Sequence, residues 1–447
     1  MKGLHQKSTA LIVWVLLFQV ISQTGYSQSI DTYRLDSYFN TLEAHNKFMG
    51  SIAIFKNGNI VYDKQIGYAD IDSQQKPDKN TKYRIGSISK TFTAVLVFKA
   101  IEADRLSLLQ TIDNYFPNIE NAGKITISHL LSHRSGIHNY TDDKEEYLSY
   151  HTNPKTEREM VEIIARGGSD FEPDSKAAYS NSNYVLLSYI LEETYQKPYS
   201  KILEDEITIP LELDNTHFGG KITLMNNEAH SYRYEKKWLK MDESNTSIGM
   251  GAGGIVSTPT DLIRFAVALF ANQLIAVENV EKMKTIQDQF GMRLFETTYY
   301  DKISYGHNGG IDGFTALLRY FPDESYAFAI TSNGENYSSN LIEVAIVNSL
   351  FNKHFDIPDF RTYTPKSKEL TPYLGRYSSD TFPIQLTVTK SGNQLYLQAT
   401  GDTKMKLQAT AKGEFKYEPA TISIVFIPEK KQLLFKQGGK TTVLKKK

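Results

Sequence analysis

The sequence predicts a mixed α/β fold of the α+β type, in which an antiparallel sheet is flanked by helices and followed by a small, separate β domain. Strand patterns occur near both ends of residues 28–354, and an all-helical subdomain is predicted between them. Short turns rather than helices join neighbouring strands, which argues against a doubly wound parallel sheet. Beyond residue 370 the pattern changes to short strands with few helical signals.

The first predicted elements are a helix and a hairpin. Apolar residues recur near helical spacing over residues 29–47. Two strands are predicted at residues 51–55 and 60–62, and Asn57-Gly58 between them is typical of a turn. A further helix is predicted from about Ser87 to residue 103.

The middle of the chain is predicted to be mostly helices and loops, over residues 105–250. The sheet is expected to resume after it. The predicted elements there are a short strand at 254–256, a helix at 260–269, strands at 315–321 and 327–331, and a helix at 340–350.

A linker is predicted over residues 355–369, because this segment is polar and carries Pro358 and Pro365. It separates a larger domain, residues 28–354, from a C-terminal β domain, residues 370–447. The strands expected in the β domain lie at 384–388, 394–398, 422–426 and 432–435.

The amino terminus resembles a signal peptide over residues 1–27. Lys2 and Lys7 precede an apolar run at residues 10–21, and Gly25-Tyr26-Ser27 fits a cleavage site before Gln28. The run is short for a membrane span, so we predict no stable membrane span after signal cleavage and a periplasmic or secreted protein. Retention of this segment as an uncleaved anchor is the alternative.

Composition excludes several function classes. The 447 residues carry a formal net charge of −1 and contain no cysteine. A nearly neutral chain has no strong field to gather nucleic acid, so we predict no nucleic-acid partner. Without cysteine the chain has no thiol nucleophile and no thiolate metal site. We expect neither a metal nor another cofactor.

The strongest chemical signal is the Ser-x-x-Lys pattern of Ser87 and Lys90. At helical spacing these side chains share one face, and a lysine with a lowered pKa can take a proton from serine. The pattern alone is weak evidence, because Ser73 and Lys76 repeat it in a polar turn. An N-cap serine beside an exposed lysine would give the same four residues.

Two later motifs add polar groups. Tyr179-Ser180-Asn181 opens an apolar helix, and a tyrosine beside cations can relay a proton. His307-Asn308-Gly309-Gly310 is expected just before the strand at 315–321. Gly309 would let a substrate lie along the strand edge, and a backbone N–H there could face an oxyanion.

These motifs and their surroundings resemble the serine β-lactamase-related, penicillin-binding-protein-like family. That family includes class C β-lactamases, D-alanyl-D-alanine carboxypeptidases, D-aminopeptidases and related esterases. The resemblance covers residues 32–352 and rests on five segments in order, which are residues 83–93 (YRIGSISKTFT), 127–137 (ISHLLSHRSGI), 179–181 (YSN), 253–258 (GGIVST) and 306–310 (GHNGG).

The resemblance implies a role for each matching residue. Ser87 would be the acylated nucleophile, Lys90 its base, and Tyr179 a proton relay to the leaving group. Asn181 would bind the substrate amide, and the backbone N–H groups of Ser87 and Gly310 would form the oxyanion hole.

His307 departs from many family members, which have the lysine of a Lys-Thr-Gly triplet there. Histidine is mostly neutral at pH 7 unless its pKa is shifted, so His307 resembles the peptidase members more than efficient β-lactamases. The C-terminal domain is similar to the lipocalin-like barrels that follow the catalytic domain in some of these peptidases.

The sequence therefore predicts an exported serine hydrolase that forms an acyl-enzyme at Ser87. The first hypothesis is a D-amino-acid peptidase, of carboxypeptidase or aminopeptidase type, acting on peptide or muropeptide amides. Its expected partners are small-molecule or peptide substrates, including cell-wall peptides. An esterase or β-lactamase using the same site is one alternative, and a non-catalytic penicillin-binding sensor or binding module is another.

Three weaker patterns favour structure over chemistry. Residues 249–254 match G-x-G-x-x-G but lack the context of a dinucleotide site, and are expected as a loop. His129 and His133, followed by His138, lack the glutamate of a His-Glu-x-x-His zinc site. Lys390-Ser391-Gly392 is expected in a hairpin turn.

Overall fold

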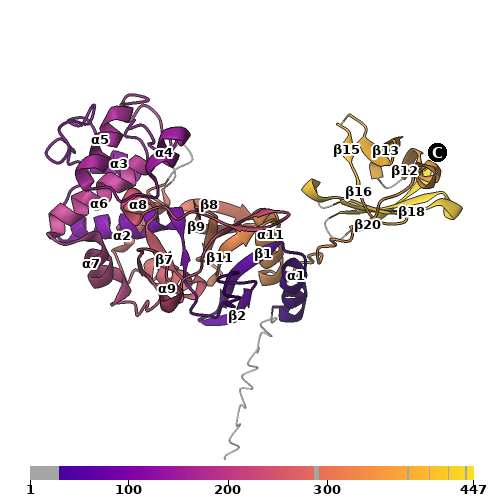
Figure 1. Ribbon diagram of the computed structural model, residues 1–447, viewed down its shortest axis with the longest axis horizontal. Coiled ribbons are helices and arrows are strands. Elements are labelled where there is room, and N and C mark those ends of the chain that lie inside the picture. Colours follow the sequence, from indigo (N-terminus) through magenta and orange to yellow (C-terminus); the bar gives the residue numbers. More distant parts are fainter. Residues whose placement is uncertain (1–29, 286–290, 380–381, 402, 421, 438–439) are drawn as a thin grey trace, which may run out of the picture.

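The computed structural model describes residues 30–285, 291–379, 382–401, 403–420, 422–437 and 440–447 (Figure 1). The predicted signal peptide, residues 1–27, lies outside them, so its cleavage and the location of the protein stay predictions. None of the helices in this described part of the chain combines the length and apolar character needed to cross a bilayer.

An antiparallel sheet forms the centre of the larger part of the molecule, with strand order β2-β1-β11-β10-β9-β8. Its strands are β1 (Phe48–Lys56), β2 (Asn59–Ile66), β8 (Phe295–Tyr299), β9 (Lys302–Ile311), β10 (Phe314–Phe321) and β11 (Tyr326–Glu335). Strands from the two ends of this part therefore pair directly, as β1 does with β11. This confirms the predicted antiparallel sheet.

Helices cover both faces of this sheet. Successive side chains of a strand point to opposite faces, and in β10 Leu317 joins one core while Leu318 joins the other. Helices α1 (Thr32–Ala44) and α11 (Ser339–Leu350) pack on the first face (Figure 1). Helices α2 (Ser89–Glu102) and α9 (Pro259–Phe270) contribute to the core on the second.

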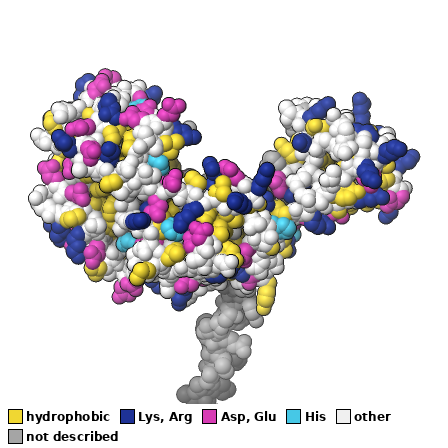
Figure 2. Space-filling model, in the orientation of Figure 1, with side chains coloured by type: hydrophobic (Ala, Val, Ile, Leu, Met, Phe, Trp, Pro, Cys, Tyr) yellow, Lys and Arg dark blue, Asp and Glu magenta, His cyan; other side chains and the backbone are white. Residues whose placement is uncertain are grey.

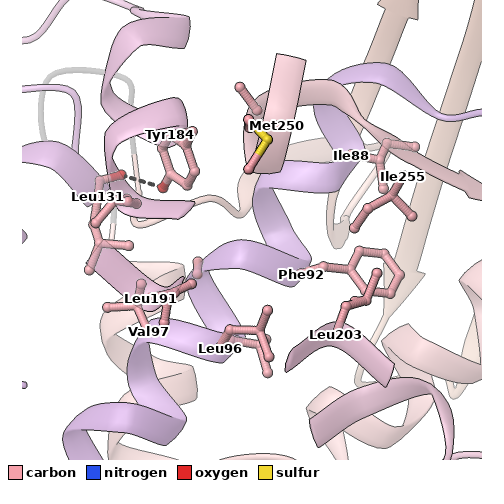
Figure 3. Close-up of a cluster of buried hydrophobic side chains, with 14 of the residues drawn as sticks. Ile88, Phe92, Leu96, Val97, Leu131, Tyr184, Leu191, Leu203, Met250 and Ile255 are labelled. Atoms are coloured by element: carbon pink, nitrogen blue, oxygen red, sulfur yellow. Dashed lines mark hydrogen bonds between the residues drawn. The ribbon is translucent and has the colours of Figure 1, made fainter. Parts of the chain in front are cut away.

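The helical subdomain lies beyond α2, between the early and late strands of the sheet. Its helices are α3 (Ile127–Leu131), α4 (Lys144–Tyr150), α5 (Glu157–Gly167), α6 (Asn181–Tyr195), α7 (Tyr199–Leu203) and α8 (Thr246–Gly253). Figure 3 shows Phe92, Leu96 and Val97 of α2 within its apolar core, where Tyr184 donates to the Leu131 carbonyl over 2.8 Å. This packing fixes α2, and with it the residues at its start.

Residues 105–250 are mostly helices and loops, as predicted, but they also contain short strands that were not predicted. Strands β5 (Tyr232–Glu235) and β6 (Lys237–Lys240) form a hairpin, and Tyr232 of β5 pairs with Gly334 of β11. The short β4 (His217–Phe218) pairs with β7 (Ile255–Ser257), which in turn pairs with β3 (Tyr83–Arg84). Strands β5 and β6 are mostly solvent-facing and mix charged with aromatic residues, so they lack the apolar pattern by which a strand is predicted.

The segment His307–Gly310 lies just before β10, as predicted, and it also belongs to a further strand, β9, that was not predicted. Glycine has a low strand propensity, so the pair Gly309-Gly310 gave no sequence signal for β9. Residues 249–253 belong to α8 rather than to a loop, Gly254 caps the end of this helix, and the helix is kinked at Met250.

The C-terminal part forms a barrel-like antiparallel sheet of nine strands with its own apolar core. These strands are β12 (Gly375–Ser379), β13 (Phe382–Ser391), β14 (Gln394–Ala399), β15 (Met405–Lys406), β16 (Gln408–Ala411), β17 (Glu414–Tyr417), β18 (Ile422–Ile427), β19 (Gln432–Gln437) and β20 (Lys440–Lys446). Gly392, with φ +58°, turns the chain between β13 and β14, as predicted for Lys390-Ser391-Gly392. The short α12 (Ser367–Leu370) begins inside the predicted linker.

Charges of both signs are mixed over the face shown in Figure 2, in keeping with the near-neutral composition.

Candidate active site

Ser87 lies in a tight turn at the start of α2. The turn η1 (Gly86–Ile88) leads directly into the helix. Gly86 has φ +50°, and a Cβ there would come within 2.6 Å of the Gly310 backbone nitrogen, so glycine is required. The turn holds Ser87 against β9 at the amino end of a helix, where unpaired N–H groups favour negative charge.

Lys90 is fully buried and points back to Ser87. Its Nζ donates to Ser87 Oγ over 3.0 Å and to the Ala252 carbonyl of α8 over 2.6 Å. Burial lowers the pKa of Lys90 to about 8, an effect that Tyr179 opposes and a further cation, Arg293, increases. A lysine that loses its proton near neutral pH can accept one from a serine hydroxyl.

Tyr179 completes a hydrogen-bonded group around Ser87. Its hydroxyl lies 2.6 Å from Ser87 Oγ, and Lys90 Nζ lies 5.0 Å from the centre of its ring. Burial alone would raise the pKa of Tyr179, but Lys90 and then Arg293 outweigh burial and lower it. The structure thus brings together three residues predicted from two separate motifs.

Asn181 is the first residue of α6, two positions after Tyr179. Its side-chain amide donates to Thr141 Oγ1 over 2.9 Å, and its backbone N–H donates to Asn139 Oδ1 over 2.9 Å. These bonds fix Asn181 in the helical wall next to Tyr179, and its substrate contact stays a prediction.

The two glycines of β9 pack against the turn that carries Ser87. A Cβ on Gly309 would collide with the Ile85 carbonyl and come within 3.3 Å of the Ser87 backbone nitrogen. Together with the closeness of Gly86 and Gly310, this contact places the backbones of Ser87 and Gly310 side by side. An oxyanion hole needs two such neighbouring backbone segments, and the role of these two N–H groups stays a prediction.

His307 is buried, and its catalytic role stays a prediction. Its Nε2 accepts a hydrogen bond from Arg293 Nη2 over 2.6 Å, and its Nδ1 bonds the Asn308 carbonyl. Burial, followed by the charges of Arg293 and Lys90, lowers the pKa of His307 well below its usual value. The imidazole is therefore neutral at pH 7.

Arg293 is the site residue that sequence reasoning missed. It lies between α10 (Val277–Lys284) and β8, it is 1% exposed, and its guanidinium lies 5.3 Å from the centre of the Tyr179 ring. No motif contains it. The available signal was an arginine within an apolar stretch, Met292-Arg293-Leu294-Phe295.

The other histidines have structural partners. His129 caps the start of α3 through Thr126, and His133 is buried beside Arg293 and Tyr179. His138 pairs with Asp143 and Asp170 on the surface. Among the residues that the structure describes, no group of three or more His, Cys, Asp or Glu side chains is arranged to hold a metal.

Comparison with known proteins supports one family. The family model "Beta-lactamase" matches residues 35–346. The chain is 24% identical to penicillin-binding protein 4* of Bacillus subtilis (strain 168), over 92% of this chain and 98% of that protein. It is 25% identical to the teichoic acid D-alanine hydrolase of Staphylococcus aureus (strain MRSA252), over 69% of this chain and 74% of that protein.

Solved structures agree with this fold. The D-amino acid amidase of Ochrobactrum anthropi SV3, complexed with L-phenylalanine amide, matches with a TM-score of 0.61 and 25% identity, covering 71% of this chain and 97% of that one. The octameric penicillin-binding protein homologue of Pyrococcus abyssi matches with a TM-score of 0.65 and 22% identity, covering 93% of this chain and 100% of that one.

Proposed function

Because the chain belongs to the beta-lactamase family and is a serine hydrolase, we propose that it forms an acyl-enzyme at Ser87 and cleaves amides of D-amino acids. The observation that carries this proposal is the hydrogen-bonded group of Ser87, Lys90 and Tyr179 beside the glycines of β9. A buried lysine and a tyrosine with a lowered pKa, both next to one serine hydroxyl, are the arrangement that nucleophilic catalysis needs.

In the proposed reaction, Ser87 Oγ attacks the amide carbonyl while its proton passes to the Lys90–Tyr179 pair. The oxyanion accepts hydrogen bonds from the backbone N–H groups of Ser87 and Gly310. The C–N bond then breaks, the amine leaves with that proton, and the acyl group stays on Ser87 as an ester. Water attacks the ester by the same route, which releases the acid and restores Ser87.

Two considerations favour a D-amino-acid amide. Relatives of this chain are a D-amino acid amidase and a teichoic acid D-alanine hydrolase. In addition, Lys90, Arg293 and His307 are all buried, and His307 is neutral, so these groups offer no exposed cation to a free substrate carboxylate. That favours an amide or aminopeptidase substrate over a carboxypeptidase substrate.

An ester of D-alanine is the second candidate, favoured by the likeness to the teichoic acid D-alanine hydrolase. The same Ser87 attack would then release an alcohol, which needs less help from a proton donor than an amine does. A β-lactam is less favoured, because neutral His307 stands where a lysine is found in efficient β-lactamases.

The test is a paired substrate panel. Purified protein is incubated with D-amino acid amides, D-Ala-D-Ala peptides and D-alanyl esters, each alongside its L counterpart. We expect the D amides to react faster than the L amides by about tenfold or more, with an acyl mass on Ser87. Faster turnover of esters would favour the second candidate, and no reaction with any member of the panel would contradict both.

We further propose that the protein is exported and acts in the periplasm or outside the cell, as residues 1–27 suggest. The intact mass of protein recovered from the producing cells tests this point. Export with cleavage predicts a chain that begins at Gln28, and a full-length cytoplasmic product would contradict it.

A further inference from the structure

Arg293 is buried in a way that needs explanation. It is 1% exposed, and its backbone has φ +81°, a conformation that non-glycine residues rarely adopt outside functional or tightly constrained sites. Thr91 of α2 donates to its carbonyl over 3.3 Å, which ties the strained residue to the helix that carries Lys90. The surrounding fold therefore directs this side chain inward at an energetic cost.

The guanidinium has no acidic partner within salt-bridge distance in the described chain. Its neighbours are three aromatic rings, at 5.3 Å for Tyr179, 4.9 Å for Tyr184 and 5.5 Å for Phe295. It hydrogen-bonds two imidazoles, those of His133 and His307. A buried cation without a carboxylate is costly unless another anion forms beside it.

Both imidazoles are neutral. Burial is the largest cause that lowers the pKa of His133 and of His307, and the charges of Arg293 and Lys90 lower them further. His307 therefore accepts a hydrogen bond from Arg293 without contributing charge, while His133 contacts Arg293 through Nε2 and accepts the Ser180 N–H at Nδ1. The permanent positive charge next to Tyr179 comes from Arg293 and not from His307 of β9.

We propose that Arg293 is a positioning residue that supplies the fixed positive charge of the site and so sets the proton content of the Lys90–Tyr179 pair. It takes over the electrostatic role of the lysine that many family members carry where this chain has His307. The inference rests on the proposed acyl-enzyme chemistry at Ser87.

The charged and titratable groups that face Tyr179 come from several elements. They are Lys90 of α2, His133 after α3, Tyr184 of α6, Arg293 before β8, and His307 of β9 behind Arg293. Tyr140 interacts with Tyr179 electrostatically as well. Within this described set, Lys90 and Arg293 are the cations, and Arg293 keeps its charge at every accessible pH.

Without the positive charge of Arg293, the Lys90–Tyr179 pair loses its proton less readily, whichever of the two residues holds that proton. The Lys90 and Tyr179 side chains belong to one hydrogen-bonded network. The pH at which a proton leaves this network therefore describes the pair and not either residue alone. Arg293→Gln should therefore shift the pH at which Ser87 acylation begins to higher values. A unit charge roughly 5 Å away in a protein interior predicts a shift of at least about one pH unit.

The experiment records Ser87 acylation against pH with a nitrophenyl ester in the wild type and four variants. Arg293→Gln should shift the profile upward, Arg293→Lys should keep it near that of the wild type, and Arg293→Gln/His307→Lys should restore it by supplying a charge from β9. Arg105→Gln is the matched control, because Arg105 is an exposed arginine 4.8 Å from the ring of Tyr195, outside the site, and its loss should leave the profile in place.

A second measurement needs no substrate. The tyrosinate absorbance difference between the wild type and Tyr179→Phe reports ionisation of Tyr179, and the same difference in the Arg293→Gln background should move to higher pH.

An unmoved titration, or a profile that neither Arg293→Gln shifts nor His307→Lys restores, would overturn the role of Arg293. A change in KM alone would instead make Arg293 a substrate-binding group. Failure of the wild type to be acylated, with the titration shifting as expected, would count against the proposed function only.

Discussion

The chain contains the pattern Ser-x-x-Lys twice, and its two copies lie in opposite environments. Ser73 Oγ donates to Asp70 over 2.7 Å, while Lys76 is 57% exposed and pairs with Glu43 over 3.1 Å. Gln74 between them has φ +57°, so the segment is a turn. Ser87 and Lys90 instead enter a buried helix, where Lys90 bonds the serine itself.

The difference between the copies is one of burial and partners. At the first copy, carboxylates take up both the hydroxyl and the ammonium group. At the second, hydrogen bonds from Lys90 go to Ser87 and to a backbone carbonyl, and burial lowers the pKa of Lys90 to about 8. The same residue types thus give a surface turn in one place and a nucleophile with its base in the other.

Replacing Ser87 and Ser73 in turn by alanine should give the largest difference in acylation rate between the two copies of the pattern. Ser87→Ala should reduce acylation by a factor on the order of 10⁴ or more, because the attacking oxygen is gone. Ser73→Ala should react like the wild type. Intact-protein mass spectrometry after exposure to a fluorophosphonate measures both, and labelling that survives in Ser87→Ala would identify another nucleophile.

Removal of each lysine should give the next largest contrast. Lys90→Ala is expected to slow acylation by about 10²–10⁴, the range that general-base catalysis provides. Lys76→Ala loses a contact with the Tyr68 ring and a surface ion pair worth roughly 0–1 kcal/mol of folding free energy, both away from Ser87, and should acylate normally. The rates come from stopped-flow with a nitrophenyl ester, and circular dichroism checks the fold. Equal rates in the two variants would remove Lys90 from the role of base.

The second copy also depends on close backbone packing, which the first lacks. Gly309→Ala should lower kcat/KM by about 10², because a Cβ would press on the Ile85 carbonyl and displace the Ser87 turn. Gly123→Ala is the control, since a Cβ at Gly123 meets no atom within 4 Å. A Gly309→Ala enzyme with wild-type kcat/KM and melting temperature would show that β9 does not position Ser87.

Sequence patterns predicted much of the fold where they follow simple periodicity. The apolar run of α2 is an example, and the short turns indicated an antiparallel sheet. Strand β9 was missed because its glycines lower strand propensity, although close packing against Ile85 and Gly86 requires them. Helix spacing predicted only the pairing of Ser87 with Lys90.

The remaining site geometry depends on contacts between residues far apart in the chain. Tyr179 meets Ser87 across 92 positions, and Arg293 meets His133 across 160. The family resemblance suggested the first contact, but no pattern pointed to the second, because Arg293 belongs to no motif. Its effect on the site comes from charge in a buried space, which becomes visible only when the chain is folded.

The smallest predicted effect is thermodynamic and follows from the burial of Lys90. Its pKa falls from 10.5 to about 8 on folding, so between these values the unfolded chain binds more protons and stability rises with pH. The cost of burying the charged lysine is therefore fully present below about pH 8 and disappears toward pH 10.5. Lys90→Met removes that cost, so its stability gain over the wild type should be on the order of 2 kcal/mol larger at pH 7 than at pH 10.

Urea unfolding of the wild type and Lys90→Met at both pH values measures this gain, with Lys76→Met as a parallel control for the loss of one lysine. Lys90→Met also removes the hydrogen bonds to Ser87 and Ala252, and the part of that loss that does not depend on the charge of Lys90 cancels in the comparison. A gain that is the same at pH 7 and pH 10 would mean that Lys90 keeps its proton in the folded protein much as it does in water. The two copies of the pattern would then differ in geometry alone, and the identity of the base at Ser87 would have to shift to Tyr179.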